Sequence, residues 1–193
     1  MSNDALQIIR EEHTAVAVML RSLKALVAQG PAGKSQRFFE VVRSMLFYID
    51  EFPERRHHPN ESRFLFPALM REAPELRPVI ERLEADHESG ERRVRELQHM
   101  LTAWEIIGEG RRALFEAALD EYVRFYLNHM RVEETELLPV AERVLPSADR
   151  QALDATFSEQ RDPLAGGHPN VEYEALFSRI AQEAPAPIGL GDE

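Results

Sequence analysis

The chain has 193 residues, of which 44% are hydrophobic and 30% are charged, a composition typical of one globular domain. Its 34 acidic residues outnumber its 23 lysines and arginines and give a net charge of −11, which argues against binding to nucleic acid or to an anionic membrane surface. The absence of cysteine excludes disulfides, thiolate-bound clusters and cysteine nucleophiles, so any metal ion must be held by oxygen and nitrogen atoms.

The beginning of the chain and its hydropathy indicate a cytoplasmic protein. Residues 1–13 include several charged side chains and lack the apolar segment of a signal peptide. No apolar run approaches the roughly 20 residues that a membrane span needs. We therefore expect a cytoplasmic chain with neither a membrane partner nor a nucleic-acid partner.

The first two predicted helices differ in regularity. In segment 6–27 apolar residues recur at alternating steps of three and four, which is the spacing of one helix face, and His13 falls on that face. Segment 38–70 is also apolar, but it contains three prolines. Because an interior proline removes a backbone donor and tends to kink a helix, we expect a bent helix or two stacked pieces there.

The next two segments repeat the pattern of the first. Segment 80–101 has the same alternating steps with His87 at the corresponding place, and segment 115–132 has His129 on its apolar face. Short segments containing glycine or proline separate the four, and short connections between amphipathic helices indicate antiparallel neighbours. The sequence therefore predicts an all-α fold, with an up-down-up-down antiparallel four-helix bundle over residues 1–145.

The C-terminal residues predict a smaller addition to this bundle. Two short helices are expected at about 148–160 and 170–183, followed by an extended tail. We treat 146–193 as a C-terminal helical extension that packs on the bundle.

An internal repeat marks two of the helices. His57 is followed by a glutamate four residues later and by a proline ten residues later, and His129 is followed in the same way. Positions i and i+4 share a helix face, so each repeat presents an imidazole together with a carboxylate.

The turn positions place these side chains at one depth of the bundle. In an antiparallel hairpin, two residues that are equally far from the turn along the sequence lie at the same height. The midpoint of His13 and His57 is position 35, that of Glu61 and His87 is 74, and that of His87 and His129 is 108. All three midpoints fall at or beside predicted turns. One buried layer is therefore expected to contain His13, His57, Glu61, His87, His129 and Glu133.

Four imidazoles and two carboxylates in one buried layer would be badly unsatisfied without a cation. Nitrogen and oxygen donors of this kind suit iron or manganese, with zinc as another option. If two metal ions take about six donors each, the six side chains and a shared oxide or hydroxide leave about two positions open. A small ligand such as dioxygen or nitric oxide would fit there.

The ordered set of motifs resembles the hemerythrin-like family, also called the HHE cation-binding domain, over about residues 3–145. The resemblance implies a four-helix bundle with a non-haem di-iron centre. It also implies a role in oxygen binding or sensing, nitric oxide binding, iron storage or repair of iron centres. By motif position the ligand roles fall to His13, His57, Glu61, His87, His129 and Glu133, with Glu61 and Glu133 bridging.

Two residues are candidates for an extra ligand. Oxygen-carrying members of the family have a further histidine four residues after the one that corresponds to His87, and here that position is Glu91. Either Glu91 ligates or one metal keeps an extra open site, and both options disfavour simple reversible oxygen carriage. His58 is the other candidate, but it points about 100° away from His57 on a helix and is expected outside the ligand set.

The acidic neighbours of the predicted ligands are expected mostly on solvated faces, with one of them orienting an imidazole; these are Glu12, Asp86, Glu88 and Glu134. A ferritin-like site built on Glu-x-x-His is a weaker alternative. Glu54 with His57, and Glu84 with His87, match that pattern, but they leave His13 and His129 unexplained.

Three functions are consistent with this site. The first is a protein that binds or senses dioxygen or nitric oxide, or that serves the response to oxidative or nitrosative stress. The second is a di-iron oxidoreductase of the peroxidase or nitric oxide reductase type, and the third is iron storage or iron-centre repair. We favour binding or sensing over a dedicated enzyme, and a homodimer is left open.

Overall fold

Every regular element of the described residues is a helix, which confirms the predicted all-α class. The computed structural model describes residues 4–31, 33, 35–168, 171–184 and 188–189. Most of the predicted extended tail, 185–187 and 190–193, lies outside the described residues. None of the described helices is long and apolar enough to cross a membrane.

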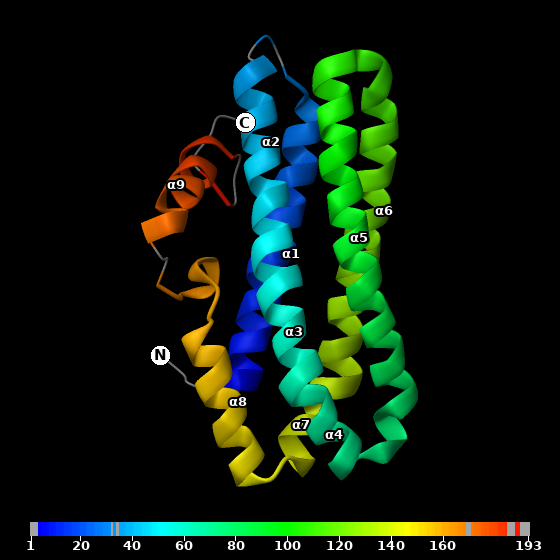
Figure 1. Ribbon diagram of the computed structural model, residues 1–193, viewed down its shortest axis with the longest axis vertical. Helices are drawn as coiled ribbons and strands as arrows, with labels where there is room; N and C mark the ends of the chain where they lie inside the picture. Colours follow the sequence, from blue (N-terminus) through cyan, green and yellow to red (C-terminus); the bar gives the residue numbers. More distant parts are fainter. Residues whose placement is uncertain (1–3, 32, 34, 169–170, 185–187, 190–193) are drawn as a thin grey trace.

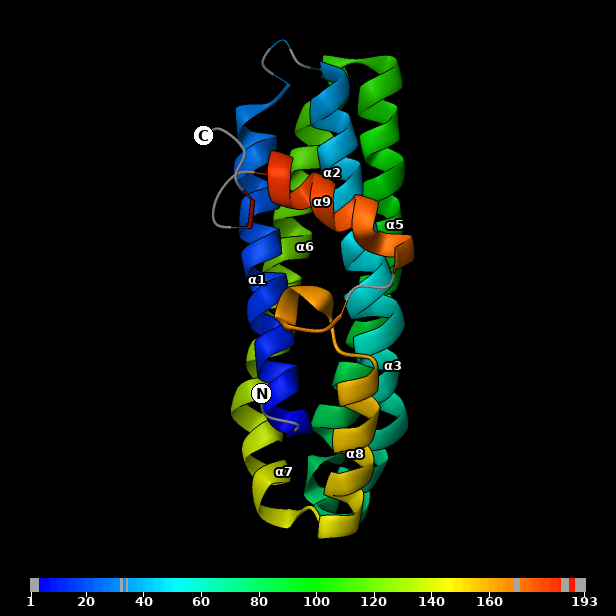
Figure 2. The same cartoon turned by 90° about the vertical axis from the view of Figure 1, so that its left-hand side faces the viewer.

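Four long helices lie side by side and define the long axis of the molecule (Figures 1 and 2). They are α1 (Ala5–Gln29), α2 (Ser35–Ile49), α5 (Arg77–Ile107) and α6 (Arg112–Val132). Helix α1 packs against α2 and α6, and α5 packs against the same two helices. The apolar faces that the spacing predicted are therefore buried between neighbours, as amphipathic helices require.

The ends of these helices follow from particular residues. The side chain of Asp4 accepts a hydrogen bond from the Leu6 N–H and caps α1, which satisfies one of the free donors of the first turn. Helix α1 ends at Gly30, with φ of 72°, and α5 ends at Gly108, with φ of 106°. Positive φ favours glycine because the residue has no Cβ, so each glycine ends its helix at the predicted turn.

Residues 35–72 form a continuous helical path rather than two stacked pieces. After α2 the chain forms a π-helical segment, Asp50–His57, then α3 (His58–Asn60), a second π-helical segment, Glu61–Leu65, and α4 (Phe66–Glu72). In both π segments an N–H reaches the carbonyl five residues back, as from His58 to Pro53. The wider π turns change the hydrogen-bond register around the prolines, and the chain continues without a break.

The second copy of the repeat has the same local structure. Helix α6 passes into a π-helical segment, Glu133–Leu137, and then into α7 (Leu138–Val144). The Leu138 N–H donates to the Glu133 carbonyl, just as the Phe66 N–H donates to the Glu61 carbonyl. Each repeat therefore begins a π turn at its glutamate.

The C-terminal residues lie along one side of the long helices. Helix α8 (Ser147–Glu159) packs against α1, and α9 (Glu174–Glu183) packs against α2 (Figure 2). Both correspond to helices that the sequence predicted, within a few residues. The division into a bundle of residues 1–145 and an extension of 146–193 stays a prediction.

Two separate apolar clusters fill the interior. The larger surrounds Trp104 and Tyr122, towards the α1–α2 and α5–α6 turns, and the smaller surrounds Phe66 and Phe157, near α4, α7 and α8. Between them lies a layer of buried polar side chains.

Candidate metal centre

The structure brings all six predicted residues into one buried layer. Each is at most 8% exposed, and Glu61 and Glu133 are fully buried. His13 comes from α1, His87 from α5 and His129 from α6, while the other three lie in the π-helical segments. The layer therefore draws on each of the long helical stretches.

The six side chains form two histidine pairs joined by two carboxylates. In one pair, His13 Nε2 lies 3.2 Å from His57 Nε2. Glu61 turns Oε1 towards this pair, 3.3 Å from His57 Nε2, and Oε2 towards the other pair, 3.5 Å from His87 Nε2. Glu133 likewise places Oε2 3.2 Å from His13 Nε2 and Oε1 3.2 Å from His129 Nε2. Each carboxylate thus faces both histidine pairs with a different oxygen.

Six of these eight polar atoms lack hydrogen bonds within the described part of the chain. Both carboxylate oxygens of Glu61 and of Glu133 are buried without a hydrogen-bond partner, and so is Nε2 of His87 and of His129. An unsatisfied buried group costs about 1–3 kcal/mol. Clusters able to hold a metal ion are formed by His13, His57 and Glu61, and by Glu61, His87, His129 and Glu133. The residues present therefore fit cations on both sides of the carboxylates.

Each of the four imidazoles also has an outer polar partner near Nδ1. The pairs are His13 with Glu134 (3.1 Å), His57 with Glu12 (2.6 Å), His87 with Ser62 (3.1 Å) and His129 with Asp86 (3.6 Å). The first three are hydrogen bonds, which fix the ring with Nε2 directed inward and available to a cation, while Asp86 is an ion-pair neighbour of His129. Three acidic neighbours take this position where sequence reasoning expected one, and Glu12 is buried rather than solvated.

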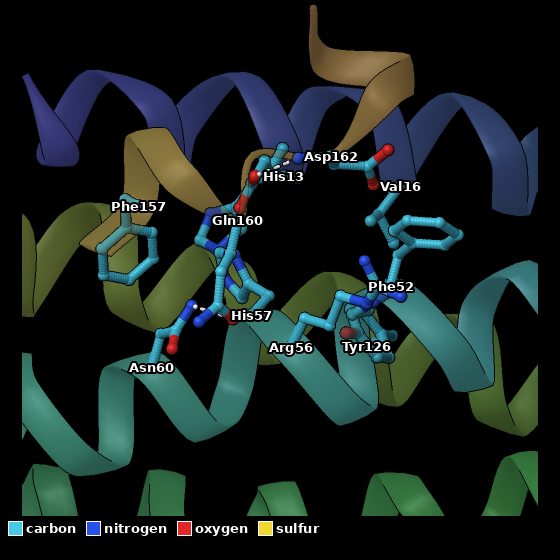
Figure 3. Close-up of a pocket in the computed structure, with 12 residues that line it drawn as sticks. His13, Val16, Phe52, Arg56, His57, Asn60, Tyr126, Phe157, Gln160 and Asp162 are labelled. Atoms are coloured by element: carbon cyan, nitrogen blue, oxygen red, sulfur yellow. Dashed lines mark hydrogen bonds and ion pairs between the residues drawn. The ribbon is translucent and has the colours of Figure 1, made fainter. Parts of the chain in front are cut away.

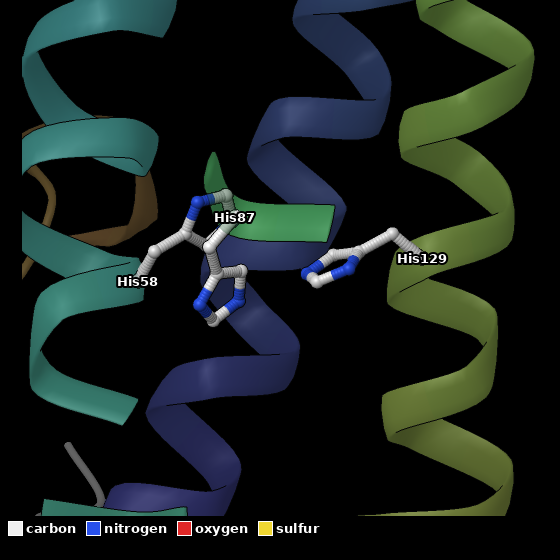
Figure 4. Close-up of side chains that lie close together, drawn as sticks. All are labelled: His58, His87 and His129. Atoms are coloured by element: carbon white, nitrogen blue, oxygen red, sulfur yellow. The ribbon is translucent and has the colours of Figure 1, made fainter. Parts of the chain in front are cut away.

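His58, which the sequence placed outside the ligand set, is buried in the same layer. Its ring stacks on that of His87 with a centroid distance of 4.0 Å, and the residue groups with His87 and His129 as a possible cation site (Figure 4). Successive helical residues point about 100° apart, so His57 faces α1 while His58 faces α5 and α6. Each of the four long helices has two neighbouring helices, which lie about a quarter turn apart around its axis. One residue therefore faces one neighbour, the next residue faces the other, and both point inward.

Glu91, the other candidate for an extra ligand, lies at the surface. Its side chain is 43% exposed and forms an ion pair with Arg95 one turn further along α5, and it belongs to neither cluster. A partner at i+4 on the same helix face holds the carboxylate at the surface. The ferritin-like alternative fails similarly, since Glu54 bonds His58 and Tyr122 while Glu84 bonds Ser62.

Glu54 is held in a close fit against α5. Its carboxylate accepts hydrogen bonds from Tyr122 and from His58 Nδ1, both at 3.0 Å. Burial raises its pKa to about 7, against the opposing effect of the Tyr122 hydroxyl. A Cβ at Gly90 would lie 2.7 Å from Glu54 Oε1. Gly90 therefore gives the carboxylate its space.

Gly90→Ala is expected to destabilise the protein by about 1–2 kcal/mol. Overpacking costs about 1–3 kcal/mol, and alanine returns at most about 1 kcal/mol of helix propensity. Urea unfolding of the metal-free variants measures the change. Gly110→Ala is the matched control, because a Cβ there meets no atom within 4 Å. Equal stability changes in the two variants would contradict the assigned role of Gly90.

The charges of the layer are strongly shifted. Burial lowers the pKa of His57, but the carboxylates of Glu61 and Glu12 outweigh it and raise the pKa well above its ordinary value. Burial likewise opposes protonation of His129, but Glu133 raises its pKa to about 10. Burial and the neighbouring His58 lower the pKa of His87 to about 4. The same pairing with His129 holds the pKa of Glu133 well below its ordinary value, against the opposing effect of burial.

These shifts predict a pH-dependent metal affinity. The raised pKa of His129 means that its proton stabilises the metal-free fold fully below pH 6.5, and that this contribution is lost as pH rises towards about 10. A cation must displace that proton. Between pH 6.5 and 8 we expect zinc affinity to rise by up to about tenfold per pH unit for each proton displaced. Titration calorimetry in two buffers of different ionisation enthalpy would count the protons, and a pH-independent affinity would contradict the assignment.

A pocket opens beside the His13–His57 pair (Figure 3). It is narrow, with about 10 Å³ of space for the centre of a water-sized sphere, close to the roughly 10–15 Å³ that one water molecule needs. Apolar walls come from Val16, Phe52 and Phe157, and the polar lining includes Arg56, Asn60, Gln160 and Asp162. The pocket thus gives one histidine pair a side on which a small molecule could approach.

The fold and the site together define a helical protein with a buried histidine–carboxylate cluster suited to cations. The chain matches the hemerythrin HHE cation binding domain over residues 4–141. It therefore belongs to the hemerythrin HHE family, as the motifs predicted. A comparison with curated proteins gives no match.

Proposed function

We propose that the chain holds a non-haem di-iron centre and that it binds or senses dioxygen or nitric oxide in the response to oxidative or nitrosative stress. His13 and His57 would hold one ion, His87 and His129 the other, and Glu61 and Glu133 would bridge them. Manganese or zinc would fit the same donors. The proposed scaffold is an up-down-up-down four-helix bundle of residues 1–145, covered by an extension of residues 146–193.

The observation that carries this proposal is the division of the two carboxylates. Each of Glu61 and Glu133 directs one oxygen towards each histidine pair, at the distances given above. A single cation would use one histidine pair and one oxygen of each carboxylate. Two cations would use both histidine pairs and both oxygens of each carboxylate. Among the residues that the structure describes, both oxygens of each carboxylate are otherwise unpartnered, which favours a paired site over a single one.

The two histidine pairs differ in their surroundings, which favours a ligand on one side. The His13–His57 pair adjoins the pocket, whereas the other pair is covered by His58 and Phe66, whose rings stack on His87. Bound iron would supply redox chemistry and an open coordination position for a diatomic molecule. The residues of the chain orient the donors, exclude bulk water and limit the size of what enters.

The oxidoreductase alternative is favoured by one observation. The Tyr126 hydroxyl lies 2.9 Å from His58 Nε2, and a hydrogen-bonded chain continues through Glu54 to Tyr122. All four side chains are buried, and His58 stacks on His87. Burial raises the pKa of both tyrosines well above its ordinary value and keeps the phenols protonated, so this chain holds two hydroxyl donors that a peroxidase or nitric oxide reductase would use. Iron storage or iron-centre repair remains the third candidate.

Metal analysis and optical spectra test the proposal. Purified protein reloaded with iron under nitrogen is expected to contain about two ions per chain. A stable and reversible absorption band on exposure to dioxygen or nitric oxide would support binding or sensing. A transient band accompanied by product would support the oxidoreductase instead. Fewer than about two iron or manganese ions per chain would contradict the paired site.

A further inference from the structure

The C-terminal segment contributes to the layer although it lies outside the matched domain. The backbone N–H of Asp162 donates a hydrogen bond of 2.8 Å to Glu12 Oε1. The other oxygen of Glu12 lies 2.6 Å from His57 Nδ1. All three residues are buried, and the matched domain ends at residue 141. A loop far along the chain thus supplies the second contact of a carboxylate that orients a candidate ligand.

The loop is itself held firmly. The Tyr48 hydroxyl, which is fully buried on α2, donates to Asp162 Oδ2. The Leu164 N–H donates to the other carboxylate oxygen at 2.8 Å, and the Gly167 N–H donates to the Asp162 carbonyl at 2.9 Å. Since a buried carboxylate is costly unless it is hydrogen-bonded, these contacts stabilise Asp162 in one position. Its N–H therefore has a fixed direction towards Glu12.

We propose that Asp162 is a positioning residue for the His13–His57 side of the metal centre, acting through Glu12 on His57. Figure 3 shows Asp162 and Gln160 beside His13 and His57 at the pocket. Without the Asp162 N–H, Glu12 Oε1 would lose its partner and the carboxylate could rotate away from Nδ1. His57 would then lose the contact that directs Nε2 inward. The expected effect of Asp162 on metal affinity rests on the proposed function. Its expected effect on the orientation of the His57 imidazole does not.

A proline at 162 removes the donor with little disturbance of the backbone. Asp162 has φ of −60° and ψ of 128°, which proline adopts without strain, and the residue lies beyond the end of α8. Asp162→Pro therefore deletes the N–H and the side chain, while Asp162→Ala deletes the side chain and keeps the N–H. The difference between the two variants isolates the hydrogen bond to Glu12.

The first readout needs no metal. In the metal-free wild type, proton NMR is expected to show a downfield Nδ1–H signal from His57, identified by its absence in His57→Ala. The signal should disappear in Asp162→Pro and persist in Asp162→Ala. An unchanged signal in Asp162→Pro would overturn the proposal, whether or not the protein binds metal.

The second readout is a titration of the metal-free variants with Fe²⁺ under nitrogen against a competing chelator. The binding step that His57→Ala removes is expected to weaken about 10–100-fold in Asp162→Pro, the usual effect of losing an outer hydrogen bond, while the other step stays within about twofold. Glu12→Gln should weaken the same step, and Asp162→Pro should add nothing in that background. Additive losses, or equal weakening of both steps, would show a merely structural role and overturn the proposal.

Two outcomes separate this proposal from the proposed function. Wild type that binds no iron but shows the NMR difference would refute the di-iron centre and leave Asp162 as a positioning residue. If Asp162→Pro does not fold, an ester in place of the Arg161–Asp162 amide serves instead, because it lacks the N–H that donates to Glu12 and keeps the Asp162 side chain. A loss of iron affinity that vanishes in the Glu12→Gln background would support the proposal, and unchanged affinity would overturn it.

Discussion

Glu133→Ala is expected to reduce iron binding from about two ions to less than one per chain. One oxygen of Glu133 faces His13 and the other faces His129, so a single substitution removes a donor from each side. By contrast, His57→Ala removes a donor from only one histidine pair. Loss of an anionic bridge also leaves two cations in close contact with less compensating charge, which is unfavourable at low local dielectric. Metal analysis after reloading under nitrogen measures the outcome.

The matched control for this prediction is Glu136→Ala. Glu136 lies in the same π-helical segment but is exposed, so its removal takes away one carboxylate without touching the layer. We expect two ions per chain in that variant, as in the wild type. Full metal content in Glu133→Ala, with wild-type affinity, would show that Glu133 does not bridge.

Removal of metal is expected to lower the melting temperature by roughly 15–30 °C. A ligand at about a thousandfold excess over its Kd stabilises the folded state by about 4 kcal/mol per site, and about 1 kcal/mol shifts the melting temperature by about 2–4 °C for a chain of this size. Two sites together therefore contribute about 8 kcal/mol. The metal-free state also has four buried carboxylate oxygens with no hydrogen bond in the described structure.

Differential scanning calorimetry before and after chelation checks this prediction. Glu133→Ala provides the internal control, since chelation of a variant that holds little metal should shift its melting temperature only slightly. His129→Ala is expected to lower metal content and melting temperature together. Equal melting temperatures for loaded and chelated wild type would refute a cation in the layer.

The position of the layer could be predicted from sequence because helices rise uniformly. Each α-helical residue advances about 1.5 Å, so counting from a turn gives the depth of a side chain in both arms of a hairpin. The midpoints at 35, 74 and 108 all lie at turns of the structure, and the six side chains meet as predicted.

The surroundings of the layer were predicted less well. The sequence placed His58 outside the ligand set because only one face of its helix was considered. A helix that packs against two inner neighbours buries residues over a wider part of its circumference. Glu12 follows the same logic, since it precedes His13 and faces His57. A charged residue next to a predicted ligand on a strongly apolar helix is the signal that would have indicated a buried partner.

The contact from Asp162 could not have been predicted from spacing at all. It lies 150 residues from Glu12 along the chain, and the loop that contains it has no helical period to relate it to the layer. Only the path of the chain beyond α8 decides where such a loop docks. Packing of the C-terminal helices on α1 and α2 thus determined a contact that local pattern does not encode.

The separation of the interior into two apolar clusters has a consequence for how the chain loses structure. Each cluster can exclude water by itself, and the polar layer between them offers little apolar contact to link them. Although the long helices run through both clusters, we expect each cluster to open as its own cooperative unit, which native-state hydrogen exchange detects as groups of amides with different opening free energies. Cations that tie all the long helical stretches together would merge these groups into one. Binding of cations in the layer would then slow hydrogen exchange of amides far from it, at both ends of the molecule.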